Sequence, residues 1–210
     1  MRIELQNLGK RFNHHWIFRN LSFSFEAGQA YAIVGPNGSG KSTLLQVIAG
    51  AAEKSEGTIS WSYQDKPLVT EEHFKKLSLA APYLELIEEL TLTEFLAFHV
   101  SFKPFLEGWT SQRIIAYIGL EKAADKQIRL FSSGMKQRVK LAQAIFSEVP
   151  VVMLDEPTSN LDQDGIDLYK RMLNDFCSNR LLIICSNEEN EIRICRHRLN
   201  VMDHKPIFVD

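Results

Sequence analysis

The chain is organised around the stretch Gly35-Pro36-Asn37-Gly38-Ser39-Gly40-Lys41-Ser42-Thr43, which fits the phosphate-loop pattern G-x-x-x-x-G-K-[ST]. Residues 31–34 before it predict a buried strand, and residues 43–48 predict a helix. In this context the glycines let backbone N–H groups surround phosphate oxygens, and the start of the helix adds a partial positive charge. Lys41 is expected to reach the β- and γ-phosphates, and Ser42 to bind Mg²⁺. The stretch therefore predicts a site for a nucleoside triphosphate.

Length and composition are those of an ordinary globular domain. The 210 residues are 45% hydrophobic and 24% charged, which suits one domain, 1–210, with room for a subdomain. The formal net charge of −2 gives no support for nucleic-acid binding, so no nucleic-acid partner is expected. No apolar run is long enough to cross a bilayer, and the start at Met1 does not resemble a signal peptide, so we expect a cytoplasmic protein. The three cysteines lack metal-site spacing and are expected to be buried free thiols.

The residues on either side of the phosphate loop predict two further structural layers. Residues 2–8, 16–25 and 58–63 favour strands, and their alternation is typical of an antiparallel sheet with one buried face. Between residues 79 and 150 the pattern becomes helical, with a capping box at Thr91 and Glu94. We therefore expect an antiparallel β subdomain beside the nucleotide core and a helical subdomain inserted into that core.

Two aromatic residues upstream of the phosphate loop are candidates for stacking on an adenine base. Phe12 and Trp16 both precede Lys41 in the chain, and either ring could return to the nucleotide. Chain position alone leaves both open.

The second half of the core brings carboxylates to the end of a strand. Val151-Val152-Met153-Leu154 is continuously apolar, which indicates a strand of a parallel sheet that is covered on both faces, and Asp155 and Glu156 follow it. Because ligands bind beyond the carboxyl ends of such strands, Asp155 is expected to hold Mg²⁺ and Glu156 to polarise the attacking water. Residues 181–185 predict another buried strand, after which Asn187 can sense a γ-phosphate.

Taken together, these motifs resemble the nucleotide-binding subunit of an ABC-type ATPase over nearly the whole chain. The signature sequence of that family is similar to Ser132-Ser133-Gly134-Met135, and its D-loop is similar to Ser159-Asn160-Leu161-Asp162. The resemblance implies an α/β fold of the P-loop NTPase class, with a mixed core sheet, an antiparallel β subdomain and a helical insertion at about 83–148. It also implies a head-to-tail dimer with itself or with a homologous ATPase subunit, in which the signature serves the nucleotide of the partner.

The chain departs from the pattern of this family at several positions. The adenine-stacking tyrosine of the family falls on Phe12, which favours Phe12 over Trp16, and the Q-loop glutamine falls on Pro82. Met135 replaces the signature glutamine, and Asn187 replaces the switch histidine. Asparagine can hydrogen-bond a phosphate but cannot carry a positive charge. We therefore expect normal binding of ATP·Mg²⁺ and slow hydrolysis by the isolated chain, with Glu156, Lys41 and Asn187 as the catalytic set.

The resemblance implies that the chain energises transport together with separately encoded transmembrane subunits, on the cytoplasmic face of the membrane. The apolar and acidic segment 83–89 is the expected docking site for those subunits, although a solvated helix face explains it equally well. A soluble ABC ATPase that takes no part in transport is the first alternative, and the short stretch between Lys41 and Asp155 argues against the long insertions of such proteins. A nucleotide-gated regulatory dimer with weak hydrolysis is the second alternative.

Overall fold

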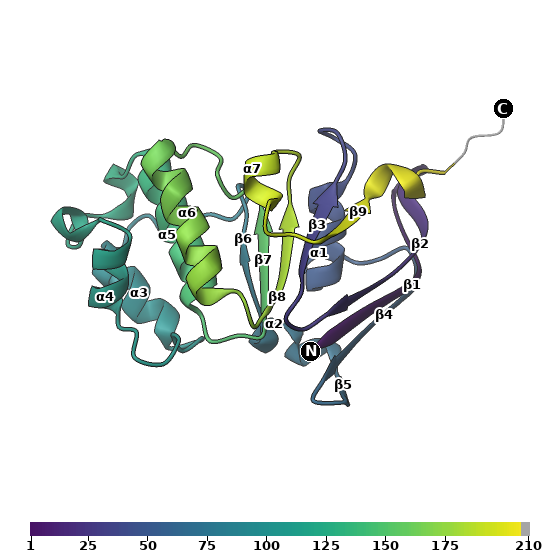
Figure 1. Cartoon of the computed structure of the whole chain (residues 1–210), viewed down its shortest axis with the longest axis horizontal. Coiled ribbons are helices and arrows are strands. Elements are labelled where there is room, and N and C mark those ends of the chain that lie inside the picture. Colours follow the sequence, from purple (N-terminus) through teal and green to yellow (C-terminus); the bar gives the residue numbers. More distant parts are fainter. Residues whose placement is uncertain (207–210) are drawn as a thin grey trace.

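The computed structural model describes residues 1–206, which form two sheets with helices packed around them (Figure 1). The first sheet is antiparallel and contains, in spatial order, β2 (His15–Glu26), β1 (Arg2–Phe12), β4 (Glu56–Tyr63) and β5 (Lys66–Leu68). The second sheet is parallel and contains, in spatial order, β6 (Leu77–Ala80), β7 (Val151–Asp155), β8 (Leu181–Cys185), β3 (Ala30–Val34) and β9 (His197–Asn200).

The predicted fold class is confirmed, but the core sheet differs in one detail. It was expected to be mixed, whereas the five strands described in it all run parallel. The alternating strands at the amino end of the chain pair only with one another, in their own antiparallel sheet. Alternation identifies an antiparallel strand with one exposed face, but it does not say which sheet the strand joins.

Helices pack against both faces of the parallel sheet. They are α1 (Lys41–Ala49), α2 (His73–Lys76), α3 (Leu92–Val100), α4 (Ser111–Tyr117), α5 (Ser133–Phe146), α6 (Gln163–Phe176) and α7 (Glu189–Ile192). Helix α1 lies on one face of the sheet, and α5 and α6 lie on the other. In Figure 1, α3 and α4 lie at the end of the molecule away from the antiparallel sheet, with α5 and α6 between them and the parallel sheet. The boundaries of the inserted helical subdomain, about 83–148, stay a prediction.

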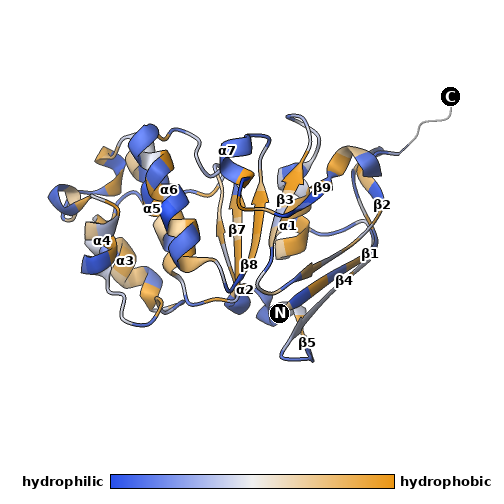
Figure 2. Ribbon diagram, viewed as in Figure 1, coloured by the Kyte–Doolittle hydropathy of each residue, from blue (hydrophilic) through white to orange (hydrophobic). Residues whose placement is uncertain are grey.

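Alternation along the central strands divides the core into two parts. In β7, Val152 and Leu154 pack with helices α3 to α6, whereas Val151 and Met153 pack with α1 and the antiparallel sheet. Both faces of these strands are apolar, and Figure 2 shows β7 and β8 as hydrophobic up to Asp155, the last residue of β7. All three cysteines are buried and unpaired, as expected from the sequence. Among the described residues no helix has both the length and the apolar character that crossing a membrane requires.

The strand order places three sequence motifs side by side. β7, β8 and β3 are neighbours and run in the same direction, so their carboxyl ends meet at one edge of the sheet. The phosphate loop follows β3, Asp155 ends β7, and Asn187 follows β8. Residues that lie more than 100 positions apart in the chain are thereby brought to one place.

Candidate nucleotide-binding site

A cavity of about 210 Å³ lies at the start of helix α1. It is lined by Ile17, Asn37, Gly38, Gly40, Lys41, Ser42, Thr43 and Glu156. Gly40 precedes the helix with a φ of 104°, and a Cβ atom at this position would collide with the side chain of Ile17. Within the described residues no side chain caps the helix at Gly40, so the first backbone N–H groups of α1 are available to a ligand. This geometry is that of an anion site at a helix start.

The side chain of Lys41 is buried against the earlier residues of the phosphate loop. Its Nζ donates to the carbonyl oxygen of Gly35 at 2.8 Å and approaches that of Pro36 at 3.4 Å. Its side chain therefore lies along the inner side of the loop, next to Ser42 and Thr43 on the wall of the cavity. A positive charge held in this position can neutralise phosphate oxygens that the loop surrounds.

Asp155 is a buried carboxylate without a hydrogen-bond donor among the described residues. It is 1% exposed, and the lack of a donor holds for both of its oxygens. Burial raises the pKa of its carboxyl to about 6, and the charge of Glu156 adds to this, while the nearby Ser42 hydroxyl and the Lys41 ammonium oppose it. A divalent cation beside Asp155 would remove this cost, so the residues present fit Mg²⁺.

The number of protein groups at this point also suits magnesium. In the described chain no cluster of three or more His, Cys, Asp or Glu side chains is placed to hold a metal. Mg²⁺ in nucleotide sites uses one or two protein oxygens and completes its shell with water and phosphate oxygens. Asp155 and the Ser42 hydroxyl would supply this number of ligands, and their role as Mg²⁺ ligands stays a prediction.

Glu156 occupies an unusual backbone conformation. Its φ is 44°, which is in the left-handed region that residues with a side chain rarely adopt. Its backbone N–H donates to the carbonyl oxygen of Cys185 at 2.9 Å, and its side chain is exposed on the wall of the cavity. Such strained residues concentrate at functional sites, where the surrounding structure holds them.

Asn187 contacts the phosphate loop directly. Its Oδ1 accepts a hydrogen bond from the backbone N–H of Gly35 at 3.0 Å, and its side chain is exposed. The end of β8, the phosphate loop and the end of β7 therefore meet at one edge of the parallel sheet, and residues of the loop and Glu156 line the cavity there. The roles of the individual residues stay predictions at this stage.

The signature and the D-loop meet at a second cavity, of about 350 Å³. It is lined by Ser132, Ser133, Gly134, Met135, Arg138, Asn160 and Asp162. Ser132 caps helix α5 by accepting from the Met135 N–H at 3.2 Å, and Asp162 caps α6 by accepting from the Gly165 N–H at 2.9 Å.

The two loops at this second cavity are held closely together. Arg138 pairs with Asp162 at 3.0 Å. A Cβ atom added at Gly134 would lie 3.0 Å from the carbonyl oxygen of Asn160. Of the other D-loop residues, Ser159 has a buried hydroxyl and Leu161 packs on the core. No residue that lines this cavity also lines the phosphate cavity.

The adenine-stacking prediction concerns residues near the hairpin of β1 and β2. Phe12 is 53% exposed, with the Lys10 ammonium 4.7 Å from its ring centroid. The Trp16 ring is contacted by the guanidinium groups of Arg11 and Arg19, at 5.4 and 4.5 Å. Ile17, which sequence reasoning did not single out, forms the apolar wall of the phosphate cavity. Stacking by Phe12 stays a prediction.

The structure also reveals contacts around Pro82 that the sequence did not suggest. The carbonyl oxygens of Pro82 and Ala81 accept from Lys140 Nζ at 3.1 and 3.4 Å. The next residue, Tyr83, lies close to Gln46 and Asp155, and burial, helped by the Asp155 charge, raises the pKa of its hydroxyl to about 12.

Comparison with known proteins identifies the family. The family model described as "ABC transporter" matches residues 18–159, which include the phosphate loop, the signature and the end of β7. The chain belongs to the ABC transporter family. Within that family it is an ATP-binding cassette, and the family is one of ATPases.

Curated ABC transporter relatives match most of this chain. The Nod factor export ATP-binding protein I of Burkholderia lata is 30% identical over 208 residues, covering 92% of this chain and 65% of the relative. The lantibiotic transport ATP-binding protein SrtF of Streptococcus pyogenes is 28% identical, covering 99% of this chain and 85% of the relative. The chain thus spans just under two thirds of the length of the first of these proteins.

Solved structures show the same fold. A bacterial ABC transporter cassette determined as a dimer superposes with a TM-score of 0.79 at 22% identity, covering 94% of this chain and 93% of that one. At this level of identity the likeness concerns the ABC fold, and it agrees with the two-sheet architecture described above.

Proposed function

We propose that this chain binds ATP·Mg²⁺ and hydrolyses ATP to drive transport across a membrane, as the energising subunit of an ABC transporter. The observation that carries the proposal is the meeting of three chain segments at the carboxyl edge of the parallel sheet, beside the phosphate cavity. Lys41 and Ser42 follow β3 and line the cavity. Asp155 ends β7 and is followed by Glu156 on the cavity wall, and Asn187 follows β8 and contacts Gly35.

We assign each predicted site residue a role. The phosphate loop, residues 35–43, surrounds the β- and γ-phosphates with backbone N–H groups, and Lys41 neutralises their charge. Ser42 and Asp155 hold Mg²⁺, which when bound neutralises charge on the β- and γ-phosphate oxygens. Glu156 accepts the proton of the attacking water, since it is a carboxylate at the open wall of the cavity. Phe12 stacks on the adenine.

Asn187 takes the position of a γ-phosphate sensor. Its amide is already at the first residue of the phosphate loop, where it accepts from Gly35. An amide can donate to a phosphate oxygen, but it cannot become a cation or pass on a proton. Because one positioned acid–base group contributes about 10² to 10⁴ in rate, we expect slow hydrolysis by the isolated chain.

The second cavity supports a dimer. Ser132, Ser133, Gly134 and Met135 lie at the start of helix α5, away from the phosphate cavity of the same chain. A second copy, or a homologous ATPase subunit, related by a twofold axis would bring this helix start to the nucleotide of the first copy. The dimer described for a cassette of similar fold is consistent with this arrangement.

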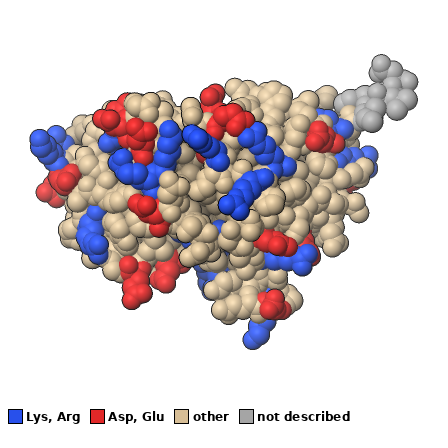
Figure 3. All heavy atoms as spheres, in the orientation of Figure 1, with Lys and Arg blue, Asp and Glu red and all other residues tan. Residues whose placement is uncertain are grey.

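The segment 83–89 is the proposed contact with a separately encoded transmembrane subunit. Its large apolar side chains, Tyr83, Leu84 and Ile87, are 38% to 43% exposed, and acidic residues alternate with them. One of these carboxylates, on Glu88, is paired with Lys136 at 2.5 Å. We infer a partner segment with apolar and basic side chains, on the cytoplasmic face of the membrane. The visible face of the molecule carries interspersed charges of both signs (Figure 3).

The decisive experiment compares ATP hydrolysis by the wild type and by Glu156→Gln, with size-exclusion chromatography of both in ATP·Mg²⁺. We expect slow hydrolysis by the wild type, and a Glu156→Gln variant that is inactive and elutes as a dimer. Two inactive proteins that both dimerise with ATP would contradict the energising role and support a nucleotide-gated regulatory module. Charge reversal at Glu85 that leaves co-purification of the transmembrane subunit intact would refute the docking proposal.

A further inference from the structure

The loop that follows Glu156 is held on both sides by buried polar side chains. From α5, the amide of Gln137 donates to the carbonyl oxygen of Pro157 at 2.7 Å. From α7, Oε1 of Glu191 accepts from the backbone N–H of Thr158 at 2.7 Å and also from the Thr158 hydroxyl. Gln137 and Glu191 are each 4% exposed. The two residues directly after Glu156 are thus fixed by contacts from two different helices.

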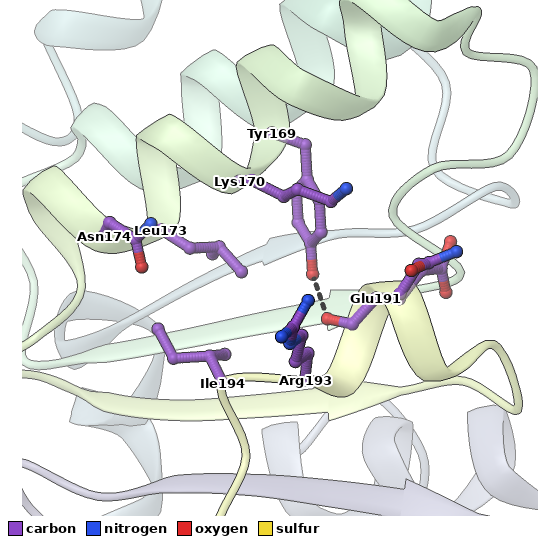
Figure 4. Close-up of a pocket in the computed structure, with 8 residues that line it drawn as sticks. Tyr169, Lys170, Leu173, Asn174, Glu191, Arg193 and Ile194 are labelled. Carbon is purple, nitrogen blue, oxygen red and sulfur yellow. Dashed lines mark hydrogen bonds between the residues drawn. The ribbon is translucent and has the colours of Figure 1, made fainter.

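The backbone of Glu191 is held by a buried tyrosine of α6. As Figure 4 shows, the Tyr169 hydroxyl of α6 donates to the carbonyl oxygen of Glu191, at 2.8 Å, while the Glu191 side chain extends away from Tyr169. Tyr169 is fully buried, so this contact fixes the backbone of α7 against α6. The Glu191 carboxylate is therefore presented to Thr158 by a rigid support.

Helix α7 begins shortly after Asn187, the proposed γ-phosphate sensor. Asn187, which contacts Gly35 of the phosphate loop, lies two residues before the first residue of α7. The N–H of Glu188 donates to the Ser186 hydroxyl at 2.9 Å, which ties this short connection together. A continuous chain of hydrogen bonds and backbone therefore runs from Gly35 through Asn187 and Glu191 to Thr158.

We propose that Glu191 is a positioning residue, which holds Glu156 in its left-handed conformation and links that conformation to the position of Asn187 at the phosphate loop. The strained φ of 44° at Glu156 persists only if its surroundings determine it, and the Glu191–Thr158 contact is two residues away. Removing the carboxylate leaves a Thr158 N–H without its acceptor and lets the loop relax. This inference rests on the proposed hydrolysis of ATP by the cavity residues.

The test compares Glu191→Ala with Glu191→Gln, which keeps an oxygen for Thr158. Loss of a hydrogen bond to a charged group lowers kcat of Glu191→Ala at least about tenfold, whereas Glu191→Gln keeps at least roughly a third of wild-type kcat. KM for ATP and the affinity for a fluorescent ATP analogue stay within about twofold in both, because Glu191 does not line the phosphate cavity. Thr158→Val, which removes only the hydroxyl, is the milder variant if Glu191→Ala fails to fold. Its expected loss is a few-fold in kcat.

The matched control is Glu189→Gln, on the same helix but exposed and paired with Arg198 at 2.7 Å. It keeps wild-type kinetics. Equal loss of kcat in the alanine and glutamine variants of Glu191, wild-type kcat in Glu191→Ala, or a parallel loss of nucleotide affinity would each overturn the proposal.

Hydrogen exchange separates this proposal from the proposed function. We expect faster exchange over residues 156–160 in Glu191→Ala than in wild type, with the phosphate loop unchanged. If the wild type does not hydrolyse ATP, the proposed function fails, and this measurement still decides the role of Glu191. Unchanged exchange over residues 156–160 would refute it.

Discussion

Asp155 is expected to destabilise the chain in the absence of nucleotide and metal, and Asp155→Asn to stabilise it. Burial raises the pKa of its carboxyl from 3.8 to about 6, so the folded chain holds a proton that the unfolded chain releases. Between these two values unfolding releases a proton, so stability falls as pH rises and the full cost is present above about pH 6. At about 1.4 kcal/mol for each pKa unit, the ionised carboxylate costs about 3 kcal/mol.

The asparagine side chain keeps the shape of the carboxylate without its charge, but its buried amide also lacks partners. We therefore expect a net gain of about 1 to 2 kcal/mol at pH 7.5, or roughly 2 to 8 °C in Tm for a domain of this size. The assay is thermal unfolding in EDTA without nucleotide at pH 7.5 and at pH 4.5, where the gain shrinks. In ATP·Mg²⁺ the order reverses, because only the wild type has the carboxylate that holds the cation. A variant that is no more stable than wild type at pH 7.5 would refute the reasoning.

Three further substitutions test other parts of the structure. Asn187→His is expected to raise kcat about tenfold or more in steady-state ATP hydrolysis, because it restores a side chain that can carry a positive charge beside Gly35. An unchanged rate would contradict the explanation of slow turnover. Burial lowers the pKa of His99 to about 4, so between about pH 6.5 and pH 4 the unfolded chain binds a proton that the folded chain does not. The free energy of unfolding therefore decreases as the pH is lowered through this range. His99→Gln should make the free energy of unfolding less dependent on pH there, as denaturant unfolding at several pH values would measure. Arg180 is buried and donates to the carbonyl oxygens of Ile145 and Ser147, so Arg180→Met should cost about 1 to 3 kcal/mol in urea unfolding for the acceptors left unpaired, and an unchanged stability would show that these contacts are dispensable.

Motifs whose chemistry is local could be read from the sequence. The capping box is an example: Thr91 Oγ1 accepts from the Glu94 N–H at 3.2 Å, and the Glu94 carboxylate accepts from the Thr91 N–H at 2.8 Å. The apolar run 151–154 is fully buried, as its continuous hydrophobicity predicted. In both cases the residues that decide the structure are neighbours in the chain, so spacing alone carries the information.

Contacts between distant segments could not be read in the same way. Strands β6 and β9 have four residues each, and β9 is mostly polar, so neither has a pattern that predicts its place at the edge of the core sheet. Gln137 and Glu191 resemble ordinary polar residues on helix surfaces. Their burial depends on which loop packs against each helix, and this follows from the tertiary structure alone.

The contact between Lys140 and Pro82 changes how the proline at the Q-loop position is interpreted. On the sequence alone, Pro82 replaces the side-chain amide of the family's glutamine with an apolar ring. In the structure the position contributes a carbonyl oxygen, which proline retains since it lacks only the N–H, and Lys140 donates to it. Lys136, one helical turn earlier on α5, pairs with Glu88. The segment that begins at Ala81 is therefore attached at both ends to α5, the helix that starts at the signature, through Lys140 at one end and Lys136 at the other.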